Sequence, residues 1–88
     1  MKGSFFQDKV AIITGASSGI GRDTALALAR QGAFVALAAR RGAALLEIAE
    51  EIKRQGRNAI VMPTDVTQRE QVEHMVQAVL TQWGRVDI

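Results

Sequence analysis

A glycine-rich turn directly follows a short apolar run near the start of the chain. Residues 9–21 read KVAIITGASSGIG, so three glycines fall within seven residues, and a helical pattern begins at Ile20. Glycine lacks a side chain, so such a turn allows the backbone to approach a ligand closely. The free N–H groups and the partial positive charge at a helix N-terminus favour an anion such as a phosphate. The stretch therefore predicts a backbone cradle for an anionic group.

Apolar runs and amphipathic stretches alternate along the rest of the chain. The runs are apolar on both faces, which is typical of central strands in a parallel sheet covered on both sides. The stretches between them repeat apolar residues three and four positions apart, as on one face of a helix. This order predicts right-handed crossovers and an α/β fold with a parallel sheet. We expect strands at residues 10–14, 33–39, 58–63 and from 86 onward, and helices at residues 20–31, 42–55 and 67–82.

The last of these helices has the clearest boundaries in the sequence. Thr67 and Glu70 match a capping box, in which each side chain accepts a hydrogen bond from a free N–H of the first turn. Gly84 is expected to end this helix, as Gly32 and Gly56 end the two before it. One face of the helix should be apolar and pack on the sheet. Its members are Val72, Met75, Val76, Val79, Leu80 and Trp83.

Composition excludes several classes of function. The 88 residues allow one domain, and the net charge of +2 is too small to indicate a nucleic-acid partner. Cysteine is absent and His74 is the one histidine in the sequence, so we expect neither disulfides nor a metal site. No apolar stretch reaches the roughly 18 residues that a membrane span needs, and the first residues lack the apolar centre of a signal peptide. We therefore expect a cytoplasmic protein that does not bind a membrane.

The glycine turn also contains a family signature. Its spacing, G-x-x-x-G-x-G, differs from the standard dinucleotide fingerprint, and glycines in such a turn can serve backbone geometry alone. The whole string TGASSGIG at residues 14–21 is far more specific. It resembles the T-G-x-x-x-G-I-G signature of the classical short-chain dehydrogenases/reductases. The resemblance extends over all 88 residues, and includes Asp65-Val66 after the third strand and the run WGRVDI at residues 83–88.

The resemblance implies both a fold and a function. The fold is the N-terminal βαβαβα(β) portion of a Rossmann-type doubly wound parallel sheet that binds NAD or NADP. Members of the family mostly interconvert alcohols and carbonyls by hydride transfer. By match of position, the backbone of residues 18–20 should lie along the pyrophosphate and the nicotinamide ribose. The implied cofactor turn consists of Gly15, Ser17, Ser18, Gly19, Ile20 and Gly21.

The end of the second strand distinguishes the two nicotinamide cofactors. A carboxylate there binds both ribose hydroxyls and favours NAD, whereas a nearby arginine favours the 2′-phosphate of NADP. NAD-type relatives have Asp at the position of Ala39, and here Arg40 and Arg41 follow it. We therefore predict NADP in preference to NAD, with Arg40 as the main contact and Arg41 as the secondary one. The alternative is that both arginines form a solvated turn, and Ser18 adds no charge where many NADP-type relatives have a basic residue.

Asp65 and Val66 are expected to contact the adenine. The resemblance implies that the Asp65 carboxylate accepts a hydrogen bond from the adenine amino group, while the Val66 N–H meets a ring nitrogen. The structural alternative is that Asp65 is a turn residue ahead of the helix that Thr67 caps. The two roles are compatible with each other.

No catalytic residue can be assigned within this sequence. Family members use a tyrosine as acid/base with a lysine four residues later and a serine, but this sequence has no tyrosine, and its lysines and serines fit no such arrangement. General acid/base catalysis needs a titratable group at the reacting atom. We therefore expect residues 1–88 to be the NAD(P)-binding Rossmann domain of a longer reductase, incomplete at its C-terminus.

Other functions stay open on the sequence alone. They are a non-catalytic nucleotide-binding module or truncated remnant, a domain that binds another phosphate ligand, and an interaction unit. Residues 86–88 would provide only the start of a fourth strand beside the first. Because an unpaired strand edge exposes free backbone groups, we also expect self-association through the sheet edge.

Overall fold

Strands and helices alternate through the part of the chain that the computed structural model describes, residues 6–17 and 19–88. Ser18 of the predicted cofactor turn lies outside the described residues. The order confirms the first six elements of the predicted β-α-β-α-β-α-β sequence, with bounds that differ from the expected ones by at most two residues. The elements are β1 (Val10–Thr14), α1 (Gly19–Arg30), β2 (Phe34–Ala39), α2 (Gly42–Arg54), β3 (Ala59–Pro63) and α3 (Arg69–Trp83).

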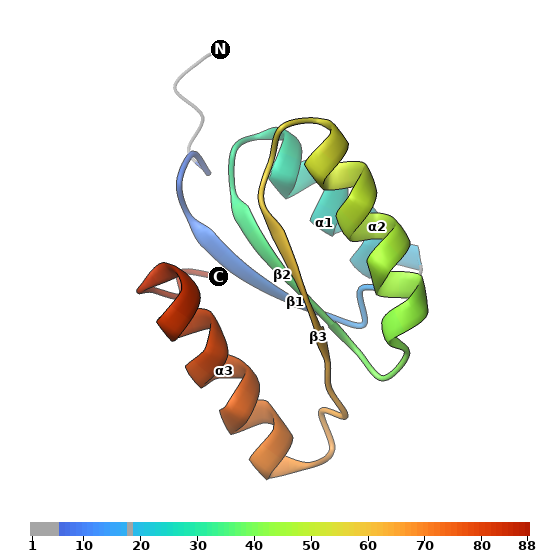
Figure 1. Cartoon of the computed structure of the whole chain (residues 1–88), viewed down its shortest axis with the longest axis vertical. Helices are drawn as coiled ribbons and strands as arrows, with labels where there is room; N and C mark the ends of the chain where they lie inside the picture. Colours follow the sequence, from blue (N-terminus) through green and yellow to red (C-terminus); the bar gives the residue numbers. More distant parts are fainter. Residues whose placement is uncertain (1–5, 18) are drawn as a thin grey trace.

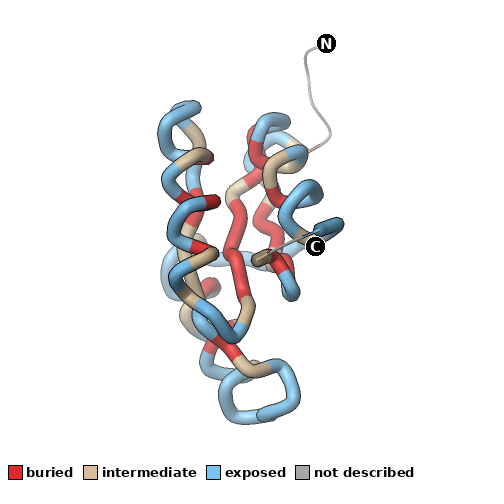
Figure 2. The backbone as a smooth tube through the Cα atoms, turned by 90° about the vertical axis from the view of Figure 1, so that its right-hand side faces the viewer, coloured by how far each residue is buried: buried red, intermediate tan, exposed pale blue. Residues whose placement is uncertain are grey.

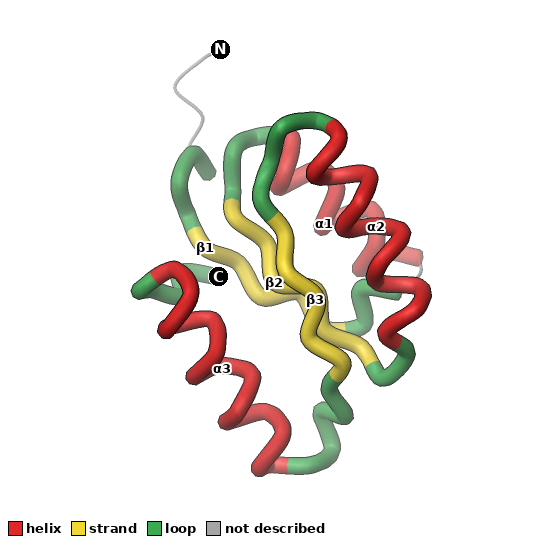
Figure 3. The backbone as a smooth tube through the Cα atoms, in the orientation of Figure 1, coloured by secondary structure: helices red, strands yellow, loops and turns green. Residues whose placement is uncertain are grey.

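The strands form a parallel sheet in the order β1-β2-β3 (Figure 3). In register, Val10 lies opposite Phe34, and Val35 lies opposite Ala59. Parallel neighbours require a crossover between them, and α1 and α2 provide these two crossovers. All three strands consequently end at the same edge of the sheet, where their carboxyl-terminal residues come together.

Helices cover both faces of this sheet. Figure 1 shows α1 and α2 on one face and α3 on the other. The two faces of β2 reflect this, because Val35 and Leu37 belong to the core under α1 and α2, whereas Ala36 belongs to the core under α3. This arrangement confirms the predicted doubly wound α/β fold. None of the helices within the described residues has both the length and the apolarity for a membrane crossing.

The larger core lies between the sheet and the helices α1 and α2. In Figure 2 the buried residues follow the strands and the inward sides of the helices. Helix α1 contributes Ala25 and Ala29, whose small side chains allow the helix to lie close to the strands. Helix α2 contributes larger side chains at helical spacing, as the sequence predicts. These are Leu45, Ile48, Ala49 and Ile52.

The core under α3 is smaller and less completely covered. Met75 and Val79 are buried there, and the Trp83 ring meets the Phe34 ring edge-on with centroids 5.3 Å apart. Trp83 is partly buried and packs against this core, as the sequence predicts. Leu80 departs from the prediction, because it is 38% exposed. The face of α3 that packs on the sheet is therefore narrower than the apolar stripe in the sequence.

The predicted capping box at the start of α3 is wrong. The helix begins at Arg69, its N-cap residue is Gln68, and no side chain caps it. The Thr67 hydroxyl instead donates a 2.6 Å hydrogen bond to the Asp65 carboxylate. An aspartate followed two residues later by a threonine can form this local turn, which competes with the helix for the same side chain.

The glycines after the three helices are confirmed as helix ends. Gly32, Gly56 and Gly84 have φ values of 94°, 78° and 81°, in the left-handed region that side chains disfavour. At the end of α3 the Gly84 N–H donates to the Leu80 carbonyl at 2.7 Å.

The last residues of the chain lie beside β1, on the side away from β2. The Ile88 carbonyl accepts from the Ile12 N–H at 2.9 Å, and the Ile88 N–H donates to the Val10 carbonyl at 3.1 Å. This is the bonding pattern of a parallel pair. Residues 85–88 have no strand conformation of their own, yet they take the position in which the sequence predicts a fourth strand.

Candidate cofactor-binding site

A cleft lies at the edge of the sheet where all three strands end. Its volume is about 300 Å³, at the lower end of the range for ligand pockets. Parallel strands place their carboxyl ends at one edge, and ligands of open α/β sheets bind there. The loops after β1, β2 and β3 all contribute to the lining. The lining residues are Gly15 and Ser17 after β1, Ala39 at the end of β2, Arg40 and Arg41 after it, and Thr64 and Val66 after β3.

The glycine turn depends on its glycines for two different reasons. Gly15 and Gly19 have φ values of 63° and 61°, so a side chain at either position would strain the backbone. Gly21 has an ordinary φ, but a Cβ atom there would collide with the carbonyl oxygen of Gly15 and lie 2.9 Å from its carbonyl carbon. Gly21 thus allows α1 to start directly against the end of β1.

Helix α1 presents its N-terminus next to the cleft. It begins at Gly19, two residues after Ser17, and its first turn contains no acidic residue that could neutralise the free N–H groups. Ile20 in this first turn is 85% exposed. The partial positive charge of the helix N-terminus is available to an anion.

Two arginines follow β2 and line the same cleft. The Arg40 side chain is 79% exposed, and its neighbour Ala39 ends the strand without a carboxylate. Arg41 is the N-cap residue of α2, with extended backbone and no side-chain cap. An arginine cannot accept a hydrogen bond from the helix N–H groups, so its guanidinium is not needed for capping.

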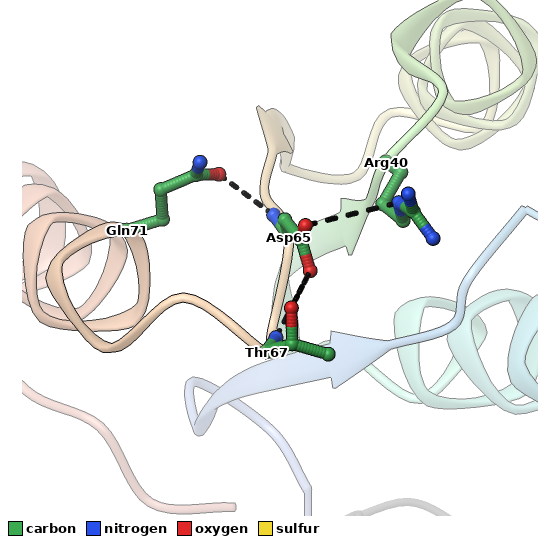
Figure 4. Close-up of polar contacts among 4 residues, drawn as sticks. All are labelled: Arg40, Asp65, Thr67 and Gln71. Carbon is green, nitrogen blue, oxygen red and sulfur yellow. Dashed lines mark hydrogen bonds and ion pairs between the residues drawn. The ribbon is translucent and has the colours of Figure 1, made fainter.

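Asp65 is the centre of a small polar network (Figure 4). One carboxylate oxygen, Oδ1, accepts hydrogen bonds from the Thr67 N–H at 3.0 Å and from the Thr67 hydroxyl at 2.6 Å. The other, Oδ2, lies 4.0 Å from the Nε of Arg40. The Asp65 N–H donates to the side-chain oxygen of Gln71 at 2.8 Å. The Thr67 hydrogen bonds, with a smaller contribution from Arg40, lower the pKa of Asp65 below its ordinary value, so the carboxylate is charged at neutral pH.

Two residues of this region were not predicted from the sequence. Thr64 is buried at 3% exposure, and its hydroxyl donates to the Met62 carbonyl at 2.8 Å, which fixes the end of β3 at the cleft. Gln71 holds the Asp65 backbone from the first turns of α3. Thr64 could have been found as the first polar residue after a strand, but nothing in the sequence indicates that Gln71 reaches back to Asp65.

The structure brings together most of the predicted site residues. Gly15, Ser17, Arg40, Arg41 and Val66 line the cleft. Asp65 does not line the cleft, but its carboxylate lies 4.0 Å from Arg40, which does. The start of α1 adjoins the cleft without lining it, and contains Gly19, Ile20 and Gly21. No group of three potential metal-ligating side chains occurs within the described residues.

Comparison with known proteins decides the family. A family profile described as short chain dehydrogenase matches residues 9–88. The chain belongs to the short-chain dehydrogenase family. The family match begins just before β1 and includes every element of the described fold.

Individual relatives agree with this assignment. The glycine betaine reductase ATRR of Emericella nidulans is 52% identical over 80 residues, which are 91% of this chain and 6% of that protein. The uncharacterized oxidoreductase Lmo0432 of Listeria monocytogenes is 49% identical over 81 residues, 92% of this chain and 33% of that protein. A solved short chain dehydrogenase/reductase from Burkholderia phymatum, in complex with NAD, is 37% identical with a TM-score of 0.89, and the match covers 92% of this chain and 29% of that one. The chain thus spans a third or less of the length of these relatives.

Proposed function

We propose that the chain is the cofactor-binding part of an NADP-dependent oxidoreductase, which transfers hydride between NADP(H) and an alcohol or carbonyl. The observation that supports this most is the position of Arg40 and Arg41 in the cleft beside an Ala39 that has no carboxylate. The family and the strand-end cleft support a dinucleotide in general, while these residues at the end of β2 support NADP in particular.

The proposed binding mode follows from the charges around the cleft. The N-terminus of α1 would hold the pyrophosphate, with the backbone at Gly15 and Gly19 close to it because neither residue has a side chain. The Arg40 guanidinium would pair with the 2′-phosphate, with Arg41 as a second cation. Asp65 and Val66 would contact the adenine. Bound NADP(H) would supply the hydride, and the residues of this chain would hold and orient it.

NAD is the second candidate for the cofactor. The solved relative from Burkholderia phymatum contains NAD, and in this chain the Asp65 carboxylate lies 4.0 Å from the Arg40 Nε. A carboxylate near the ribose disfavours a 2′-phosphate by charge repulsion. Two positive charges from Arg40 and Arg41 against one negative charge favour NADP.

Replacement of Arg40 by aspartate tests the cofactor choice. Arg40→Asp removes a charge-assisted hydrogen bond and adds a repulsive charge, so the affinity for NADPH should fall at least about tenfold. The affinity for NADH should stay constant or rise. Arg54→Asp makes the same charge change at the other end of α2 and should alter neither affinity. An unchanged ratio of NADPH to NADH affinity in Arg40→Asp would refute the assignment.

A non-catalytic nucleotide-binding module is the second candidate function. The sequence has no tyrosine, and no Asp, Glu, His or Lys is among the residues that line the cleft. We therefore propose that this chain by itself binds the cofactor without reducing a carbonyl. NADPH-dependent reduction of a carbonyl by the purified 88-residue chain would contradict this.

The edge of β1 supports a further proposal, self-association. Asp87 and Ile88 bond to β1 at Val10 and Ile12, and no described hydrogen bond from residues 85–88 reaches Thr14, the next residue on this edge. Unpaired strand edges pair with other chains. We expect sedimentation velocity to show a concentration-dependent dimer, whereas a monomer at all concentrations would count against self-association.

The proposed compartment is the cytoplasm.

A further inference from the structure

We propose that Asp65 opposes the binding of a 2′-phosphate by attracting the Arg40 guanidinium, and that it thereby sets how strongly the site prefers NADP over NAD. This inference rests on the proposed function, and it gives Asp65 a role beyond contact with the adenine. The observation behind it is the 4.0 Å approach of Asp65 Oδ2 to Arg40 Nε, across the loops that follow β3 and β2 (Figure 4).

The carboxylate is fixed in place, while the guanidinium is not. Two hydrogen bonds from Thr67, at 2.6 Å and 3.0 Å, hold Oδ1 of Asp65. The hydrogen bond to Gln71, at 2.8 Å, holds its backbone N–H from α3. Because Oδ1 and the backbone are both anchored, Oδ2 stays directed toward Arg40. The side chain of Asp65 is 26% exposed and that of Arg40 is 79% exposed, so Arg40 is the partner that can move.

A 2′-phosphate would have to share Arg40 with this carboxylate or displace it. A guanidinium offers its five N–H donors in a planar fork, and bidentate pairing uses two parallel donors. At 4.0 Å the Arg40 Nε and the Asp65 carboxylate form an ion pair and not a hydrogen bond, so the carboxylate competes with a phosphate for Arg40 through its charge. NAD has no 2′-phosphate, so the same contact does not affect it through Arg40. Asp65 therefore changes the ratio of the two affinities, and not simply the strength of nucleotide binding.

Replacement of Asp65 by asparagine separates charge from position. Asn retains a side-chain oxygen that can accept from the Thr67 N–H and hydroxyl, but it lacks the charge that attracts Arg40. Any hydrogen bond to the adenine changes equally for both cofactors, so it cancels in the affinity ratio. An exposed ion pair of this kind corresponds to a change of about two- to fivefold in that ratio.

The experiment is a double-mutant cycle read by nucleotide binding. Dissociation constants for NADPH and NADH are measured by fluorescence titration of the 88-residue chain, of Asp65→Asn, of Arg40→Gln and of the double variant. We expect Asp65→Asn to raise the preference for NADPH about two- to fivefold, and to have no effect on it when Arg40 is already Gln. In an Arg41→Gln background the effect of Asp65→Asn should persist, which makes Arg41 the matched control.

The outcomes separate the inference from the proposed function. If neither nucleotide binds the unsubstituted chain, the proposed function and this inference both fail. If NADPH binds but Asp65→Asn leaves the ratio unchanged, or raises it equally in the Arg40→Gln background, the inference alone is overturned. A second measurement needs no nucleotide, because the Arg40 Nε–H resonance should shift in Asp65→Asn. Circular dichroism of each variant confirms that it folds.

Discussion

The Asp87 carboxylate accepts a 2.9 Å hydrogen bond from the Val10 N–H, and so joins the last residues of the chain to its first strand. Arg85 holds the same carboxylate through Nε and an Nη, at 2.9 Å and 2.7 Å. The backbone bonds between Ile88 and β1 lie beside it. This cluster places residues 85–88 where a neighbour of β1 belongs, although they do not form a strand.

The contribution of Asp87 to the stability of the fold should depend on pH. The hydrogen bonds from Arg85, followed by the one from Val10, lower the pKa of Asp87 below its ordinary value of 3.8. A carboxylate with a lowered folded-state pKa stabilises the fold above its unfolded-state pKa, and this contribution is lost as the pH falls toward the folded-state pKa. Asp87→Asn should therefore lower the melting temperature at pH 7, and the difference from the unsubstituted chain should shrink below pH 4.

Asp23→Asn is the control for this measurement. Asp23 lies on the surface of α1, and its side chain is 79% exposed. It forms an ion pair with Arg22 at 3.8 Å. The Asp23→Asn variant should have the same melting temperature as the unsubstituted chain at neutral pH. A melting temperature of Asp87→Asn that equals that of the control at pH 7 would show that the Asp87 cluster does not stabilise the fold.

The second prediction concerns the contact between Gly21 and Gly15. A Cβ atom at position 21 would overlap the Gly15 carbonyl, and this backbone atom cannot move without shifting β1 or α1. Gly21→Ala should lower the free energy of unfolding by about 1–3 kcal/mol, as overpacking does, and should weaken NADPH binding because the turn is displaced. Urea denaturation and nucleotide titration measure the two effects.

Gly56→Asn is the matched control, since Gly56 ends α2 with a φ of 78° and a Cβ there would meet no atom within 4 Å. Asparagine tolerates this conformation, so the loss should stay below about 1 kcal/mol with NADPH binding intact. Equal losses of nucleotide affinity in both variants would mean that the Gly21 contact is not specific to the site.

Two adjacent leucines of α2 should differ in how much they contribute to stability. Leu45 is fully buried against the sheet, whereas its neighbour Leu46 is 55% exposed. Leu45→Ala should cost about 2–5 kcal/mol through lost burial and the remaining cavity. Leu46→Ala should change stability by less than about 0.5 kcal/mol. Thermal unfolding followed by circular dichroism distinguishes them, and similar transitions in both variants would contradict the orientation of α2.

Most of the fold could be predicted because its signals are local. Runs such as residues 34–39, apolar on both faces, are typical of a strand between two helix layers, and β2 has helices on both of its faces. The spacing of Leu45, Ile48 and Ile52 indicates the buried side of α2 without any tertiary information. Leu80 shows the limit, since its exposure depends on how much sheet lies under α3.

The site was predicted less completely. Gly15 and Ser17 lie within three residues of the end of β1, and Arg40 and Arg41 within two residues of the end of β2. Parallel topology brings these strand ends together. The capping box was wrong because Thr67 can bond either a helix N–H or the Asp65 carboxylate, and local sequence does not decide between them. The bond of Gln71 to the Asp65 backbone depends on the path of the loop between β3 and α3, which no motif specifies.

The central claim is that a dinucleotide with a 2′-phosphate binds at the carboxyl edge of the sheet. The most direct test is titration of the ¹⁵N-labelled 88-residue chain with NADPH, followed by amide chemical shifts. We predict saturable shifts at Gly15, Ser17, Arg40 and Val66, which line the cleft, and none at Gly56, which lies at the opposite edge before β3. Shifts centred on Gly56, or no saturable shifts at the cleft residues, would contradict the claim.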